Sequence, residues 1–430
     1  MYDGTAALGD VVVKLPVFSG MVIDPAFVKE LWTRHRARVL AVGVALLALA
    51  SLRNLQWGLD RLLWSQERIG AIDLKLRHTE VQTWFAGQPV YGPPIHSCYP
   101  PASFLLLWPF VGWLEITPTR WLWAISAVVL LGWLSCLCVR ESGAQTRLER
   151  LFAALLPVSI SGVGLALATG QLPLHVLPVL VAGLSLLHRT RGRLLAELGG
   201  AAWIVVALVK PNIAAPFFWI VLFVPGTLRP AVLVVAGYVA LTLFASAFQP
   251  VSLATLLTQL AGSGSFIGAN PSAMVSYGTL HTWAGSLGFG RWNSALSFLA
   301  LGALGVWTFL HRRSDVWLLI GVAGVVSRIW TYHGIYDDVL IVLPMLALFR
   351  LAKQSPPTCG TGVWAGVLLA LTTLAMATPM RVWQFPPPWC WFFTIGHAVV
   401  WLGVLIFLMY CARRTGDCRA EPQAATSPRP

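Results

Sequence analysis

Long apolar runs, separated by short polar or basic stretches, dominate this chain. Most runs have about 15 to 23 residues, close to the roughly 20 that cross a bilayer as a helix. Polar and apolar side chains do not alternate within them, as they would in strands of a membrane barrel. The pattern predicts an all-α polytopic membrane protein with roughly 11–13 membrane helices, including short broken or re-entrant ones.

The predicted spans are of unequal quality. The first is 39–52, and the stretch 103–139, which contains Pro109 and Pro118, predicts a short re-entrant or broken helix followed by a full one. Two segments that meet at Lys210-Pro211 are each too short for an ordinary crossing and predict an elbow inside the protein. These two segments are 200–210 and 211–225. The remaining spans are expected at 151–169, 172–188, 231–248, 294–311, 315–331, 337–351, 362–378 and 389–411.

Basic residues set the orientation. They form short clusters between the apolar runs, beginning with Lys29, Arg34 and Arg38 before the first span. Placing these clusters in the cytoplasm follows the positive-inside rule. The chain then divides into a cytoplasmic segment 1–36, a single membrane domain 37–411 with outer-face loops 53–101 and 249–293, and a disordered cytoplasmic tail 412–430. The turn at Gly170-Gln171, the elbow and the segment 328–340 open toward the same outer face.

Composition supports a membrane protein and narrows its partners. The 430 residues are 57% hydrophobic and 11% charged, with a mean hydropathy of +0.71. The net charge of +13 is explained by topology-setting clusters, so no nucleic-acid partner is expected. The seven cysteines have no metal-type spacing and require no disulfide. No nucleotide-binding motif or nucleophile elbow is present, so an activated substrate must bring its own energy.

The segment from Arg328 to Leu340 concentrates ionisable groups where they are costly. It holds Arg328, His333, Asp337 and Asp338 between two apolar runs, together with aromatic residues that include Tyr336. One interpretation is a structural network with Arg328. A metal site is a second, although one His and two adjacent Asp match no standard spacing. We favour substrate binding, with His333 donating to a phosphate or hydroxyl.

A second candidate segment follows the first span. Asp73, Arg77 and Glu80 can share one side of a possible helix. The other side can carry Ile72, Leu76, Trp84 and Phe85. This pattern fits an interfacial amphipathic helix with solvated charges and a weak Asp73–Arg77 pair. It fits equally a general base, Asp73, held near the bilayer surface.

Three further motifs are weak when taken alone. Tyr99 precedes two prolines that start a helix at headgroup level. Gln171 ends a turn between two apolar runs and offers both a donor and an acceptor. Lys210 either snorkels to the surface, pairs with Asp337 or Asp338, or contacts a phosphate, to which Asn212 at the following helix start would add donors.

Taken in order, these motifs resemble a known family. An early outer-loop Asp73, Tyr99-Pro-Pro, Gly-Gln171, Lys210-Pro and His333 followed by Tyr336-Asp337 resemble the polyprenol-phosphate-mannose-dependent mannosyltransferases of glycosyltransferase family 87, which have the GT-C fold. The similarity runs from about residue 70 to 350.

The resemblance implies a polytopic enzyme that transfers a hexose, usually mannose, with inversion. The donor would be a polyprenyl-phosphate-linked sugar, the acceptor a glycolipid or glycan hydroxyl, and the reaction would face the periplasm or cell exterior of the plasma membrane. Asp73 would be the base. Lys210, His333 and Arg328 would contact the donor phosphate. The substrate-binding residues would be Arg77, Tyr99, Gln171, Asn212, Tyr336, Asp337 and Asp338.

Cofactor use, one alternative function and a third interpretation, a non-catalytic assembly factor, stay open at this point. The residue set requires no cofactor, and Asp337 and Asp338 leave a divalent metal open. The alternative is a transporter or flippase for a lipid-linked or amphipathic solute, with its site at the broken spans. Ionisable groups gathered at span ends on one side, without a visible internal repeat, favour the enzyme.

Overall fold

The computed structural model describes residues 25–67, 70–190, 192–269, 277–354 and 360–420. About 80% of the protein is helical, and the described residues contain no strand. The membrane-domain helices begin with α1 (Pro25–Leu63), α2 (Ile72–Phe85), α3 (Pro101–Val111), α4 (Ile116–Ser142), α5 (Arg147–Ser159), α6 (Ser161–Thr169), α7 (Pro173–Arg189), α8 (Leu194–Ala207), α9 (Pro211–Phe223) and α10 (Leu228–Ser246). They continue with α11 (Leu253–Ala269), α12 (Leu280–Ser286), η2 (Gly290–Trp292), α13 (Asn293–Leu310), α14 (Val316–Ile329), η3 (Ile335–Ile341), α15 (Val342–Gln354), α16 (Gly360–Ala377), η4 (Met380–Gln384) and α17 (Trp389–Ala420).

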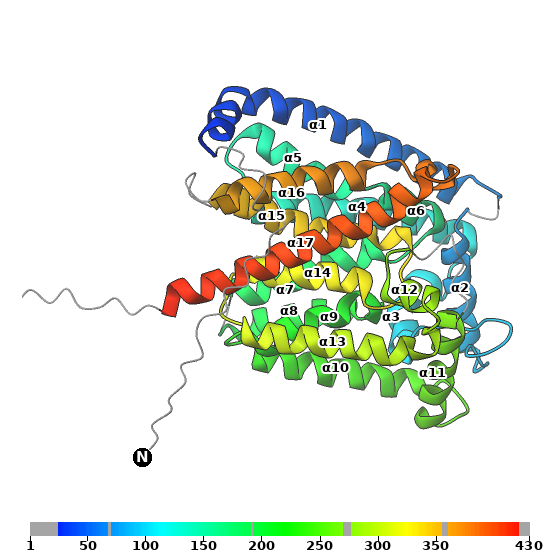
Figure 1. The fold of residues 1–430 in the computed structure, drawn as a ribbon. Helices are drawn as coiled ribbons and strands as arrows, with labels where there is room; N and C mark the ends of the chain where they lie inside the picture. The colour runs from blue at the N-terminus through cyan, green and yellow to red at the C-terminus, as the bar shows by residue number, and fades with distance from the viewer. Residues whose placement is uncertain (1–24, 68–69, 191, 270–276, 355–359, 421–430) are drawn as a thin grey trace, which may run out of the picture.

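Most of these helices lie side by side in one bundle (Figure 1). Within the described residues, six helices are long and apolar enough to cross a membrane: those within α1, α4, α10, η2–α13, α16 and α17. Five shorter apolar helices, α3, α7, α8, α9 and α14, complete the bundle. The predicted all-α polytopic membrane protein is therefore confirmed.

The predicted breaks at 103–139 and at Lys210 are present. The first stretch divides into the short α3 and the 27-residue α4. The second is an elbow in which Lys210 caps α9 and Pro211 begins it. Proline suits this first helical position because its missing N–H would have no helical partner there.

The span expected at 151–169 is broken, which the sequence did not predict. Helices α5 and α6 meet at Ile160 with a bend of 46°. The Asn54 side chain of α1 donates to the carbonyls of Val158 (3.1 Å) and Ile160 (2.9 Å) at this break. Such carbonyls would otherwise be costly in a membrane protein, so the break depends on a polar residue of α1.

Several predicted boundaries differ from the structure. The first crossing runs from Ala37 to Leu63, so the outer segment begins later than residue 53. The region 249–293 is largely helical in α11, α12 and η2. Helix α17 continues to Ala420, past the expected start of a disordered tail at 412, and η3 occupies the start of the span expected at 337–351. Parts of the predicted terminal segments, 1–24 and 421–430, lie outside the described residues.

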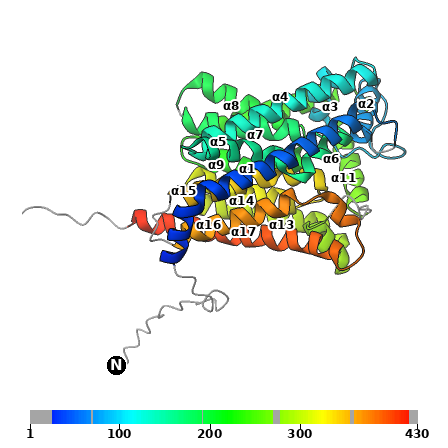
Figure 2. The ribbon, with the colours of Figure 1, turned by 90° about the horizontal axis from the view of Figure 1, so that it is seen from above.

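Helix α2 lies at one end of the bundle (Figures 1 and 2). The burial of its side chains shows that its charged side faces the protein interior. Arg77 and Glu80 are buried, whereas Ile72 and Leu76 are each 37% exposed. The interfacial helix with solvated charges is therefore contradicted for this segment. Burying charged side chains costs free energy unless they are paired with one another or contact a ligand.

Close backbone approaches hold α2 on the bundle. The Ala71 N–H donates to the Ala168 carbonyl near the end of α6 at 2.8 Å. Gly170, which follows α6, has a positive φ of 74°. A Cβ on Gly170 would lie 2.5 Å from the Cβ of Leu74. At the other end of α2, the Trp84 indole donates to the Ala245 carbonyl of α10 at 3.1 Å. These contacts fix the end of α2 that carries Asp73 next to Gln171.

Candidate active site

A buried chain of polar contacts links the elbow to the segment before α15. The Lys210 Nζ lies 2.8 Å from Asp337 Oδ1 and 3.4 Å from Gln171 Oε1. On the other carboxylate oxygen, His333 Nδ1 lies 2.8 Å from Asp337 Oδ2. Because a carboxylate only accepts, this contact places a proton on Nδ1 and turns the other imidazole nitrogen, Nε2, away from Asp337. Nε2 is buried and makes no hydrogen bond to the described part of the protein.

Asp73 faces this chain from α2. Burial raises the pKa of its carboxyl above the ordinary value, while the charge of Arg77, hydrogen bonds with Thr169 and Gln171, and the charge of Lys210 oppose that rise. A carboxylate with a raised pKa is a stronger base than a solvated one. Gln171 therefore contacts both Asp73 and Lys210, and bridges the two sides of the cluster.

Arg77, one turn after Asp73, is engaged elsewhere. Its guanidinium forms an ion pair with Glu80 and lies 4.2 Å from the centre of the Tyr99 ring. Both Arg77 and Glu80 are almost fully buried. Burial raises the pKa of Glu80 to about 7, against the lowering effect of Arg77. The positive charge of Arg77 therefore lies near Asp73, although Arg77 forms its ion pair with Glu80.

Tyrosine rings complete the surroundings of Lys210. Tyr336 places its ring 5.0 Å from Lys210 Nζ, an arrangement that favours a cation. The backbone carbonyl of Tyr99 accepts a hydrogen bond from the Tyr91 hydroxyl at 2.8 Å. This contact holds the segment just before α3 in place beneath Arg77. Tyr332 hydrogen-bonds with Cys98, so it joins the same region to the segment after α14.

Arg328 and Asp338 form a separate cluster behind η3. Arg328 Nε lies 2.7 Å from Asp338 Oδ1, and the Tyr277 hydroxyl donates to Asp338 Oδ2 at 2.7 Å. The Arg328 guanidinium also lies 4.7 Å from the ring of Trp401. Adjacent carboxylates thus turn to different partners: Asp337 to Lys210 and His333, and Asp338 to Arg328. This geometry matches the structural network weighed for Arg328, rather than a contact shared with Lys210.

Asn212 contributes through its backbone. Its carbonyl accepts a hydrogen bond from the Trp330 indole at 2.8 Å, and the Ile213 carbonyl accepts one from the Ser327 hydroxyl at 2.8 Å. These bonds tie the start of α9 to the end of α14. They hold Lys210 opposite Asp337, although the two residues are 127 positions apart in the chain.

Sequence reasoning grouped Glu80 with Asp73 and Arg77 but gave it no role, and it gave none to Tyr277, Tyr332 or His281. Glu80 had a usable signal, since it lies three positions after Arg77 and seven after Asp73, on one side of a helix. Tyr332 lies within the segment 328–340 that the sequence had already marked, whereas Tyr277 and His281 had no local signal. Tyr277 reaches Asp338 across 61 positions.

The arrangement combines three chemical capabilities. Asp73 can accept a proton. Lys210 and His333 offer donors that can face an anion, with Asp337 fixing both. Burial excludes water and strengthens these electrostatic effects. A base and a cationic anion site in one water-poor cluster suit the transfer of a group whose leaving atom carries negative charge.

The fold is a membrane-embedded helical bundle, and the comparison with family models identifies its class. The model of glycosyltransferase family 87 matches residues 98–331, more than half of the chain. The protein therefore belongs to glycosyltransferase family 87, and it is a glycosyltransferase. Tyr99, Gln171 and Lys210 lie within the matched segment, whereas Asp73 and His333 lie outside it. No curated protein and no solved structure matches the chain.

Proposed function

We propose that the protein transfers mannose from a polyprenyl-phosphate donor to a hydroxyl of a glycolipid or glycan acceptor. The supporting observation is that Asp73 and the Lys210–Asp337–His333 chain, from opposite parts of the sequence, meet around Gln171. This cluster carries a base for an acceptor and donors for a departing phosphate. The GT-C fold, the polyprenyl carrier and mannose are parts of this proposal suggested by the family resemblance.

The reaction is a single displacement. Asp73 removes the proton from the acceptor hydroxyl, and the acceptor oxygen forms a new bond to the anomeric carbon. The bond from that carbon to the phosphate oxygen breaks, and the electron pair leaves with polyprenyl phosphate. Lys210 and His333 stabilise the negative charge that develops on this oxygen. Transfer in one step inverts the anomeric configuration.

Single displacement is supported by the state of the other carboxylates. Glu80 is paired with Arg77, Asp337 with Lys210 and His333, and Asp338 with Arg328. A retaining route would use a second carboxylate as a nucleophile beside the sugar. Within the described cluster, Asp73 is the carboxylate without a direct ion pair, and this favours its use as a single base.

His333 is suited to respond to the donor. Burial lowers its pKa, and the negative charge of Asp337 opposes this shift. A phosphate beside Nε2 adds a second anion and favours the imidazolium form. The same proton then stabilises the departing phosphate. No metal is needed for this step, and the adjacent carboxylates Asp337 and Asp338 are not arranged to share one ligand.

The reaction is proposed to face the periplasm or cell exterior of the plasma membrane. The charged ends of α4, α7 and α15 lie at the opposite end of the bundle from Asp73, as the positive-inside rule requires for an outer-face site. A transporter would also use broken helices. The family assignment and the inward base favour the enzyme.

The test uses the full chain reconstituted in lipid with radiolabelled polyprenyl-phosphate mannose and a glycolipid extract. We expect equal amounts of released polyprenyl phosphate and labelled acceptor. Asp73→Asn should lower kcat by about 10²–10⁴-fold, the usual contribution of a general base, while donor binding is retained. Full activity of Asp73→Asn would refute the base assignment. Absence of transfer with any lipid-phosphate-linked sugar would refute the proposed function.

A further inference from the structure

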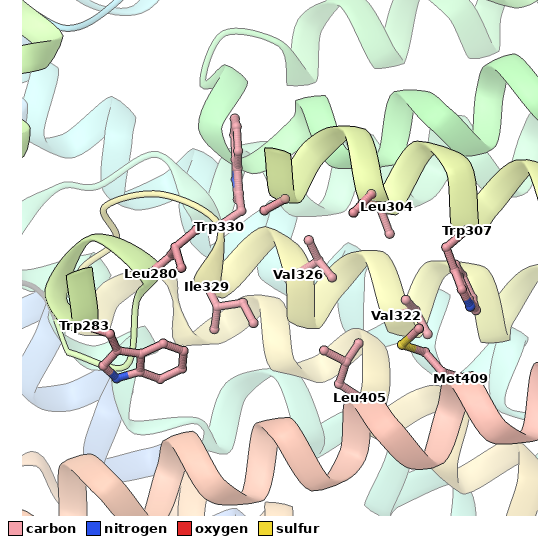
Figure 3. Close-up of a pocket in the computed structure, with 12 residues that line it drawn as sticks. Leu280, Trp283, Leu304, Trp307, Val322, Val326, Ile329, Trp330, Leu405 and Met409 are labelled. Carbon is pink, nitrogen blue, oxygen red and sulfur yellow. The ribbon is translucent and has the colours of Figure 1, made fainter. Parts of the chain in front are cut away.

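An apolar slot lies between α13, α14 and α17, with α12 near one end (Figure 3). Its cavity volume is about 230 Å³. Trp283 and Trp330 lie at the end near α12, and Trp307 and Met409 lie at the other (Figure 3). The slot is a feature of the membrane helices and is separate from the polar cluster around Lys210.

The shape and lining of the slot specify the chemistry of its occupant. All of its lining side chains are aliphatic, aromatic or thioether groups. It follows α14 from Ile329 to Val322, a rise of about 10 Å for seven helical residues. A narrow apolar slot of this length, running along membrane helices, fits an extended hydrocarbon chain and rejects a sugar or a phosphate.

One end of the slot lies next to segments that carry the polar cluster. The Trp330 indole, which lines the slot, donates to the Asn212 carbonyl, two residues after Lys210. His281 follows the lining residue Leu280, and its ring centre lies 6.3 Å from that of Tyr332. The Nε2 atom of His281 lies 2.7 Å from Ser297 Oγ, whereas its buried Nδ1 makes no hydrogen bond within the described protein. A ligand with an anionic head and an apolar tail would span this junction.

We propose that the slot binds the first isoprene units of the lipid-phosphate donor. The phosphate then lies at Lys210 and His333, His281 lies beside the path between phosphate and tail, and the chain runs past Trp330 toward Trp307. The head-group part of this inference rests on the proposed function. The donor is favoured over the acceptor because the acceptor must reach Asp73 on α2, which packs on α3, α4 and α6.

A photoreactive analogue tests this directly. The full chain in nanodiscs is illuminated with farnesyl phosphate that carries a diazirine on its second isoprene unit, and adducts are mapped by mass spectrometry. We expect adducts on slot residues such as Ala300, Val326 and Leu405, and their loss when unlabelled farnesyl phosphate is added. Adducts confined to lipid-exposed positions outside the slot, such as Val232 and Val235 of α10, would overturn the inference, as would labelling that competitor does not reduce.

A pair of variants on one helix gives a matched control. Ala303→Trp puts an indole into the slot, whereas Ala295→Trp adds the same indole at an exposed position of α13 that does not line it. Filling the slot removes apolar contact with the chain, so Ala303→Trp should reduce competable labelling about tenfold and raise KM for the farnesyl donor by a similar factor. Ala295→Trp should change neither. Equal effects of both variants, or none of Ala303→Trp, would contradict the slot.

The two proposals can fail separately. Transfer with the natural donor but no slot labelling of the wild-type chain would overturn the tail site alone. Slot labelling without transfer from any lipid-linked sugar would overturn the proposed function and leave a lipid-phosphate site. Because labelling is measured on the wild-type chain, the result does not depend on whether Ala303→Trp folds.

Discussion

Ion pairs occur at both ends of the bundle, and they differ in exposure. At the basic end, where α4 and α7 finish, Arg189 meets Glu141 and Arg229 meets Glu197, with the arginine side chains 49% and 64% exposed. In the two pairs of the site region, both partners are buried: Lys210 and Asp337 are 7% and 1% exposed, and Arg328 and Asp338 are 0% and 2%. The cations of the two site pairs therefore lack the hydration that the arginines of the basic end keep.

This difference in exposure changes what each ion pair contributes to stability. A pair with one solvated partner contributes about 0–1 kcal/mol and is easily replaced. A buried pair often gives no net stability relative to apolar residues, but losing one partner costs about 3–5 kcal/mol. A membrane protein has little reason to keep such pairs for stability. The buried ion pairs around Asp73 and Lys210 are better explained by a reaction that needs charges held in place away from water.

Removing Lys210 should have the largest effect. Lys210→Met leaves Asp337 buried without its cation and removes a donor to the phosphate. We expect kcat/KM to fall about 10²–10³-fold, the usual loss for one oxyanion donor. Thermal unfolding should also show a loss of about 3–5 kcal/mol. A Lys210→Met enzyme with near-normal kcat would mean that the buried pair is structural only.

Changing Glu80 should alter the pH dependence. Asp73 acts when deprotonated, so activity is lost as the pH falls through its raised pKa. Glu80→Gln removes a neighbouring negative charge and frees Arg77 to pair with Asp73, and both changes lower the pKa of Asp73. The acid limb of the kcat/KM profile should move to lower pH, with a plateau about tenfold lower because the base is weaker.

The matched control for this change is Glu80→Asp, which keeps the charge. It should retain the position of the acid limb even if its shorter side chain lowers activity. An acid limb that stays in place in Glu80→Gln would show that Glu80 does not control the base.

The cluster behind η3 should give a smaller effect. Tyr277→Phe removes one hydrogen bond to Asp338 and leaves the Arg328–Asp338 pair intact. We expect a loss of about 1–3 kcal/mol in stability, since a buried acceptor loses a donor. The KM for the donor should not change, as Tyr277 is not among the groups around Lys210. A large rise in KM would move Asp338 and Arg328 into the substrate site.

The exposed pair at the basic end should give the smallest effect. Arg229→Gln replaces a mostly solvated side chain paired with Glu197. A change in stability of about 0–1 kcal/mol and unchanged kcat are expected. If this variant were as damaging as Lys210→Met, the contrast between the two ends would be wrong.

The sequence was informative where a local pattern decides the outcome. Apolar run lengths predicted the helical membrane class, and Pro109, Pro118 and Pro211 predicted the breaks near them. The bend at Ile160 was missed, although Pro157 and Gly162 flank it and such residues favour kinks. Its contact with Asn54, more than a hundred positions away, has no local signal. The inward orientation of the charged side of α2 was likewise missed. Its charge pattern fits either orientation, and only packing against α3, α4 and α6 selects one.

For the site residues, too, the sequence predicted what local patterns decide and missed what depends on packing between distant segments. Topology placed Asp73, Gln171, Lys210 and His333 on one face, and the structure brings these four segments together. The pairing could not be read in advance. Asp337 and Asp338 are adjacent in the chain, yet they face opposite partners because η3 turns tightly between α14 and α15. Their separate tasks arise from three-dimensional packing.

Asn54 gives the outermost helix an unexpected importance. Helix α1 crosses the face of the bundle and could be taken for a simple anchor (Figure 2). Yet its amide completes the break before Gly162, where a Cβ would collide with the Ile335 carbonyl of η3. A shortened enzyme lacking α1 would leave the carbonyls of Val158 and Ile160 without donors. It would also weaken the packing of α6 against η3, the element that carries Asp337. The membrane anchor and the catalytic architecture of this enzyme are therefore not separable modules.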